Sequence, residues 1–203
     1  QMFTDNIVAF DDPRLETVYE HYENNLSDTV SRLQDKGIHV LLSSVPVNLR
    51  DSAPFASQHP PRLSDDAVNT LNRQLQYSAA RFKDQRFRDA VNALAAAEAI
   101  APRYADTHYQ LGIAYEQLGQ NAESAEHFQQ ALDLDTLRFR ADTQINARIR
   151  RVAERFNDTA FSFVDSETAF KQASQPTKQP LARVPRLQHH EVTKARKNPV
   201  ELC

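Results

Sequence analysis

The sequence predicts an α/β protein in which a parallel sheet is interrupted by an inserted helical module. Three observations lead to this prediction. A helical pattern over residues 12–36 runs into a short apolar stretch at 38–45, and a second helix and strand follow over 137–164. Residues 64–135, between these two parts, carry a 34-residue internal period. We therefore expect an α/β domain formed by two parts and separated by repeats, followed by a tail, with the divisions 1–63, 64–136, 137–175 and 176–203.

The first helix and strand follow from local signals. Asp12 suits the N-terminal cap, Pro13 suits the first helical position, and Gly37 suits the C-terminal stop. The nearly continuous apolar run at 38–45 is typical of a strand buried on both faces, as in a parallel sheet. Residues 46–63 contain four prolines and predict a long loop at the carboxyl end of that strand, where open α/β sheets place ligands.

The repeat is visible when the chain is aligned with itself at an offset of 34 residues. The alignment places small residues opposite small ones and large apolar residues opposite large ones: Ser78 with Gly112, Leu94 with Phe128, and Ala97 with Ala131. A 34-residue unit of two helices is typical of the tetratricopeptide repeat. The first copy has Gln85 where the second has the turn residue Gly119. Since about three repeats are needed for an independent fold, we expect flanking helices to support these two.

Four residues of the second repeat share the helix face that usually lines a tetratricopeptide groove. They are Asp106, Tyr109, Ile113 and Glu116. We predict that they contact a protein or peptide ligand, because stacked repeats present extended concave surfaces to partners. The alternative is that the embedded repeats serve only as a structural cover.

The third part contains an amphipathic helix over 137–156 and a strand over 160–164 that ends at Asp165. The tail at 176–203 holds six basic and two acidic residues with four prolines, which predicts a disordered basic tail. Within it, His189 and His190 lack a nearby carboxylate cluster, so no metal site is predicted there.

Composition excludes several classes of function. The three glycines of the chain form no phosphate-binding loop, dinucleotide fingerprint or nucleophile elbow, so no nucleotide cofactor is expected. Cys203 is the sole cysteine, and a net charge of −3 argues against nucleic-acid binding. No apolar run approaches 18 residues, so no integral membrane span is expected. The absence of a visible signal segment favours a cytoplasmic location.

Two stretches beside the repeats carry a resemblance to a known family. They are Val47-Asn48-Leu49-Arg50-Asp51 and Leu137-Arg138-Phe139-Arg140-Ala141-Asp142. With the embedded repeats, they are similar to a bacterial group of SGNH/GDSL-type hydrolases. The resemblance implies a flavodoxin-like parallel sheet, present here in part, and a Ser-His-Asp site for ester or acyl cleavage.

The catalytic motifs of that family are not visible in the sequence. Gly-Asp-Ser and Gly-x-Asn would precede Gln1, and Asp-x-x-His should follow Asp165. We therefore assign no catalytic residue and expect an inactive, incomplete form of the hydrolase. Four polar residues near predicted strand ends are the candidates to face a substrate: Asn48, Arg50, Asp51 and Asp165. The alternative is that the first three pin the loop and Asp165 caps the following helix.

Two functional hypotheses remain at this point. The first is an SGNH/GDSL-like ester hydrolase scaffold without its visible nucleophile segment. The second is a non-catalytic tetratricopeptide module for protein–protein interaction, with its ligand in the groove of the second repeat.

Overall fold

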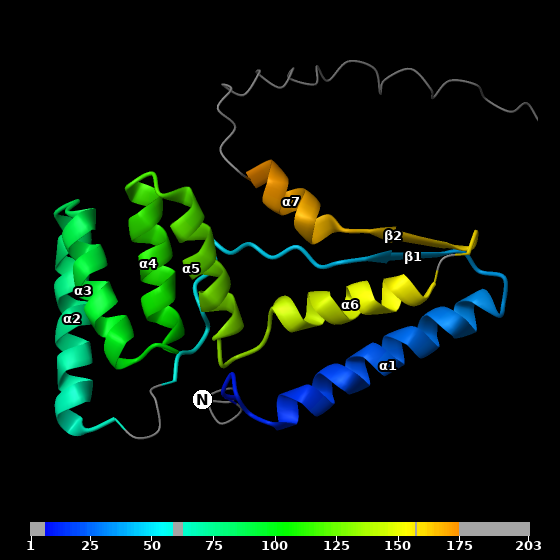
Figure 1. The fold of residues 1–203 in the computed structure, drawn as a ribbon, viewed down its shortest axis with the longest axis horizontal. Helices are drawn as coiled ribbons and strands as arrows, with labels where there is room; N and C mark the ends of the chain where they lie inside the picture. The colour runs from blue at the N-terminus through cyan, green and yellow to red at the C-terminus, as the bar shows by residue number, and fades with distance from the viewer. Residues whose placement is uncertain (1–6, 59–62, 157, 175–203) are drawn as a thin grey trace, which may run out of the picture.

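A computed structural model describes residues 7–58, 63–156 and 158–174 (Figure 1). This part of the chain contains seven helices and two strands. In chain order they are α1 (Arg14–Gln34), β1 (Val40–Ser43), α2 (Asp65–Lys83), α3 (Phe87–Ile100), α4 (Ala105–Gln117), α5 (Asn121–Asp133), α6 (Thr143–Arg155), β2 (Phe161–Val164) and α7 (Ser166–Ser174). Figure 1 shows α2–α5 as a helical block at one end, with α1 and α6 side by side along the strand pair.

The predicted α/β fold with a flavodoxin-like sheet is wrong. Helix accounts for 63% of the structure and strand for 5%. Within the described ranges the sheet consists of β1 and β2 alone, paired in parallel with Val40 opposite Phe161. A pair of four-residue strands is a minimal sheet in a mostly helical protein. A flavodoxin-like fold needs a wide sheet that is covered on both faces.

The physical reason for the error lies in the apolar run at 38–45. Val40 is buried, but Leu41 is 67% exposed and Val45 is 41% exposed. The strand therefore has one covered face, on which Val40 packs with Val30 of α1 and Val152 of α6. A continuous apolar run does not distinguish a strand with two covered faces from one with a single covered face.

A polar contact set joins α1 to α6 beside this small core. The Tyr19 hydroxyl donates a hydrogen bond to the Asp142 carboxylate, which also accepts from the Ile145 backbone N–H at 3.0 Å and so caps α6. One turn further along α1, the buried Glu23 accepts from the Arg148 guanidinium at 3.2 Å. Charged groups at a buried helix interface remain stable when they are paired in this way.

The helical block is built from two similar helix pairs. In the second pair, Gly112 of α4 lies directly against the ring of Phe128 on α5. In the first pair the equivalent residues are Ser78 and Leu94, both fully buried. Where the second pair combines glycine with phenylalanine, the first pair therefore combines a slightly larger residue, serine, with a smaller apolar one, leucine.

The two repeats also end their first helices in the same way. Gln85 after α2 has φ 57° and Gly119 after α4 has φ 74°, both in the left-handed region. The next residue closes the turn in each copy: Arg86 N–H donates to the Arg81 carbonyl and Gln120 N–H donates to the Tyr115 carbonyl, both at 2.9 Å. The glutamine thus occupies a backbone conformation that favours glycine.

Replacing Gln85 with glycine is expected to stabilise the chain by about 0.5–1 kcal/mol, because glycine adopts this backbone conformation without steric cost. The measurement is the free energy of unfolding in urea. Gly119→Ala is the matched control and should destabilise by about 1 kcal/mol. Equal stability of Gln85→Gly and wild type would contradict the equivalence of the two turns.

Two further sequence predictions concern the tail and membrane-spanning helices. The tail predicted over 176–203, with His189 and His190, lies outside them. Among the helices that the structure describes, none has the length and apolar character needed to cross a lipid bilayer.

Candidate functional site

An extended part of the chain follows β1 and crosses to the helical block, where it lies against α4 (Figure 1). We call residues 48–57 the loop segment. The chain just before this segment is fixed by α6. There Asn146 exchanges two hydrogen bonds with the Val45 backbone, at 2.8 and 3.0 Å. A peptide-like stretch thus lies on the face where the sequence predicts a groove.

The first half of the loop segment contacts α4 through Arg50. The Tyr109 hydroxyl donates to the Arg50 carbonyl at 2.8 Å, and Arg50 Nε donates to both Glu116 carboxylate oxygens at 3.1 Å. Arg50 also binds Asp51 at 2.5 Å and lowers the pKa of that carboxyl, assisted by Asn48. The contact combines backbone recognition with a charge pair, as in the binding of an extended peptide.

The second half of the loop segment is held more deeply. The buried Asp135 accepts from the backbone N–H groups of Phe55 at 2.9 Å and Ala56 at 3.1 Å. The Phe55 ring packs edge-on against Phe139 with centroids 5.4 Å apart, beneath the Arg140 guanidinium. These contacts anchor the segment independently of Arg50.

Two of the four predicted groove side chains therefore contact a segment of their own chain. Tyr109 and Glu116 contact Arg50 directly, and the Asp106 backbone N–H donates to the Ser57 hydroxyl at 2.9 Å. The Asp106 carboxylate accepts from Gln110 within α4 at 2.6 Å, and Ile113 is half-buried on the same helix.

Three of the four predicted substrate-facing residues belong to this contact region, and the fourth does not. Asn48, Arg50 and Asp51 lie in the loop segment, where Asn48 Oδ1 accepts from the Asp51 N–H at 3.0 Å. Asp165 lies at the end of β2 and accepts from Arg150 and from the Ser44 hydroxyl, at 2.7–3.0 Å. The Arg150 hydrogen bonds hold the pKa of Asp165 well below its usual value. Asp165 also accepts from the Thr168 N–H and caps α7.

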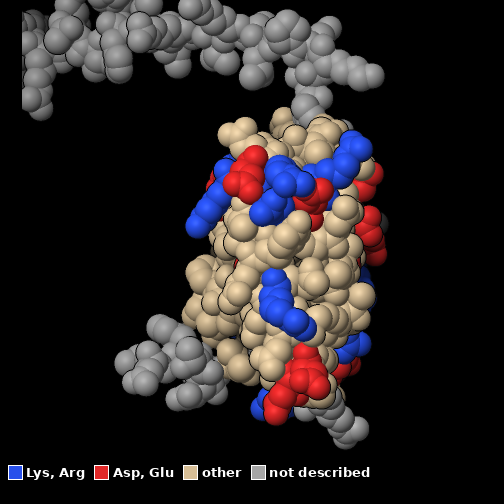
Figure 2. Space-filling model, turned by 90° about the vertical axis from the view of Figure 1, so that its left-hand side faces the viewer, with Lys and Arg blue, Asp and Glu red and all other residues tan. Residues whose placement is uncertain are grey.

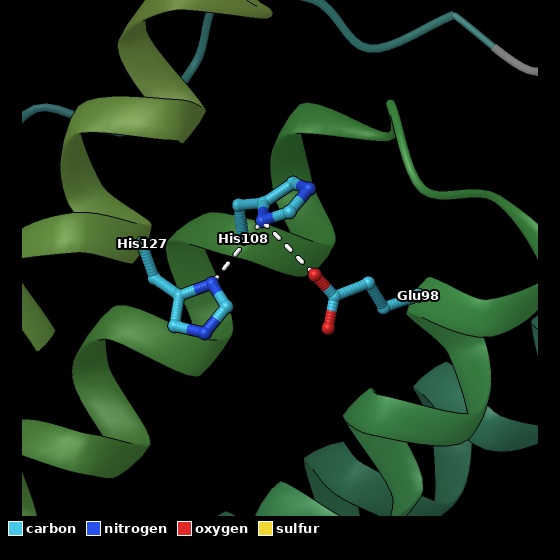
Figure 3. A group of neighbouring side chains, drawn as sticks. All are labelled: Glu98, His108 and His127. Carbon is cyan, nitrogen blue, oxygen red and sulfur yellow. Dashed lines mark hydrogen bonds and ion pairs between the residues drawn. The ribbon is translucent and has the colours of Figure 1, made fainter. Parts of the chain in front are cut away.

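A second cluster of polar side chains lies within the helical block. Glu98 of α3, His108 of α4 and His127 of α5 direct their polar atoms toward one another (Figure 3). The sequence analysis missed this cluster. The Gly112–Phe128 contact would have indicated that His108 and His127 are neighbours, because each lies within one turn of that contact on its helix.

The outer face of α2 and α3 offers less for a ligand to recognise. Figure 2 shows charged side chains mainly toward its two ends and uncharged side chains over most of the middle. A shallow depression of about 230 Å³ lies between the two helices, and its lining includes Gln74, Tyr77 and Asn92. In the site on α4, by contrast, Tyr109 and Glu116 both hydrogen-bond to Arg50.

Two similar helix pairs, α2 with α3 and α4 with α5, pack side by side, and the loop segment lies against α4. Comparison with known protein families matches residues 105–136 to the tetratricopeptide repeat. These residues include α4 and α5, the clearer of the two repeats in the sequence. No curated protein and no solved structure matches the chain. None of the comparisons supports a relationship to SGNH/GDSL-type hydrolases.

Proposed function

We propose that this chain is a protein–protein interaction module that binds extended peptides in the groove of its second tetratricopeptide repeat. The observation that carries the proposal is the seating of the loop segment on α4. Tyr109 recognises a backbone carbonyl and Glu116 recognises a basic side chain, which are the two elements needed to hold an extended basic peptide.

The loop segment acts as an internal ligand in this proposal. Its Arg50 end is exposed, with 56% of the side chain accessible, whereas the buried Asp135 holds the backbone of the other end. Exposed ion pairs contribute little to stability, because solvent screens the two charges. An incoming peptide therefore displaces the Arg50 end at low cost while the anchored end stays in place.

The charge of the groove indicates the class of peptide. Asp106 and Glu116 are the two charged members of the predicted groove, and both are acidic. The internal ligand presents a basic residue, Arg50, to Glu116 at 3.1 Å. We infer that the partner carries an arginine or lysine in an extended segment.

The hydrolase hypothesis gains nothing from the site and is not proposed. Asn48, Arg50 and Asp51 bind one another or α4, and Asp165 is engaged with Arg150 and with the start of α7. A nucleophile with a base within hydrogen-bond reach is the requirement for serine ester cleavage. These four residues include no hydroxyl nucleophile.

The test uses an open variant in which Asn48–Asp51 are replaced by Gly-Ser-Gly-Ser, with the Asp135 anchor intact. A fluorescein-labelled peptide of residues 47–57 is titrated against it, and fluorescence anisotropy is measured. We expect the peptide to bind the open variant at least about tenfold more tightly than wild type, because the tethered segment competes at high effective concentration. Tyr109→Phe and Glu116→Gln in the open variant should each weaken binding by about two- to fivefold.

Glu123→Gln, at an exposed site on α5, is the matched control and should leave peptide affinity unchanged. Circular dichroism checks that every variant keeps its helix content. A folded open variant that fails to bind the peptide would contradict the proposal. Binding that is insensitive to both groove substitutions would contradict it equally.

A further inference from the structure

We propose that Glu98, His108 and His127 form a Zn²⁺ site that ties the two repeats together. The three residues come from α3, α4 and α5, so they span the junction between the first helix pair and the second (Figure 3). Two imidazoles and a carboxylate are a ligand set that Zn²⁺ accepts, with a water completing the tetrahedron.

The spacing of the donor atoms is close to that of a tetrahedral zinc site. The two Nδ1 atoms of His108 and His127 are 3.2 Å apart, and a Glu98 oxygen lies 3.8 Å from His108 Nδ1. The donor atoms of all three residues lie within 4.8 Å of one another. Zinc–ligand bonds of about 2.0–2.2 Å place tetrahedral donors about 3.3 Å apart, so only the Glu98 side chain needs to move closer.

The tautomer of His108 favours cation binding at its Nδ1 atom. Its Nε2 lies 2.8 Å from the Pro102 carbonyl oxygen, which can only accept, so Nε2 carries the proton. In the neutral ring Nδ1 then presents a lone pair toward His127 and Glu98. Metal-binding histidines are fixed in the same manner, by donating their other N–H to a backbone carbonyl.

Burial and access are compatible with metal entry. His108 is 3% exposed, whereas the Glu98 side chain is 34% exposed and gives the cluster an opening to solvent. The His127 ring lies against the His108 ring, with centroids 5.4 Å apart. The His127 ring is also held by stacking on Tyr115, with centroids 5.3 Å apart.

Metal binding would restrict the movement of one repeat against the other. A bound Zn²⁺ would link α3 to α4 and α5 and fix the first repeat relative to the second. The alternative is a hydrogen-bonded histidine pair that holds a proton and binds no metal. Zinc titration distinguishes the two.

The experiment uses the full chain with His189→Ala, His190→Ala and Cys203→Ser, which removes other metal-binding side chains of the tail. Zn²⁺ is titrated by calorimetry, and the melting temperature is measured with and without metal. We expect one equivalent to bind and to raise the melting temperature. Glu98→Gln and His127→Ala should each weaken binding by about tenfold or more, whereas His21→Ala, at an exposed position on α1, should not.

Co²⁺ provides an independent readout, because a tetrahedral site gives intense visible absorption that an adventitious octahedral site does not. Glu98→Gln keeps the shape of the side chain at a partly exposed position, so it tests the site even if His127→Ala loses its fold. Absence of one-equivalent binding would overturn the proposal. Zinc affinity that is unchanged in folded Glu98→Gln would overturn it as well.

Discussion

Gly112→Ala is expected to lower the free energy of unfolding by about 2 kcal/mol. A β-carbon at this position would lie 2.7–2.9 Å from three atoms of the Phe128 ring. Phe128 is buried on α5, so the ring would have to shift within the packed interior. Overpacking of this kind costs about 1–3 kcal/mol or more, and the better helix propensity of alanine offsets about 1 kcal/mol of it.

Urea unfolding of Gly112→Ala, Phe128→Leu and the double variant measures this effect. The first repeat combines Ser78 with Leu94 at the same positions, so a smaller partner should accept the added carbon. We therefore expect Gly112→Ala to cost much less in the Phe128→Leu background than in wild type. An equal loss of unfolding free energy in both backgrounds would contradict the close contact between Gly112 and Phe128.

Glu23→Gln is expected to destabilise the chain by about 2–3 kcal/mol. The carboxylate is 8% exposed and pairs with Arg148, whose side chain is also 8% exposed, and with Arg155. Removing one partner of a buried pair costs about 3–5 kcal/mol because the remaining charge is left uncompensated. We expect a smaller loss here, since Arg148 retains Glu16 at 2.6 Å.

Glu20→Gln, at an exposed position on the same helix, is the control and should change stability by less than about 0.5 kcal/mol. Thermal unfolding at neutral pH compares the two variants. Equal melting temperatures for Glu23→Gln and Glu20→Gln would show that the α1–α6 interface does not depend on the buried charge.

The helical repeats could be predicted from sequence because their packing is local and periodic. Gly112 contacts Phe128 on the adjacent helix, and Ser78 and Leu94 have the same spacing in the first repeat. The sheet could not be predicted in the same way. Exposure of Leu41 depends on which elements cover the strand, and an apolar run carries no information on that point.

The candidate site was predictable as two separate sets of residues but not as one site. Helix periodicity places Tyr109 and Glu116 on one face, and position after the strand singles out Arg50. Their contacts join residues 59 and 66 positions apart, through an irregular loop with no period of its own. The cluster of Glu98, His108 and His127 was missed for a related reason, since its side chains come from three helices in two repeats.

The central claim is that Glu116 binds a basic residue of an extended peptide in the groove. Exchanging the charges of Glu116 and of Arg50 in the peptide tests it most directly. The open variant and its Glu116→Arg derivative are each titrated with the labelled 47–57 peptide and with the same peptide carrying Arg50→Glu. We expect the original peptide to prefer the open variant and the reversed peptide to prefer the Glu116→Arg derivative. Equal affinities of both peptides for both proteins would contradict the claim.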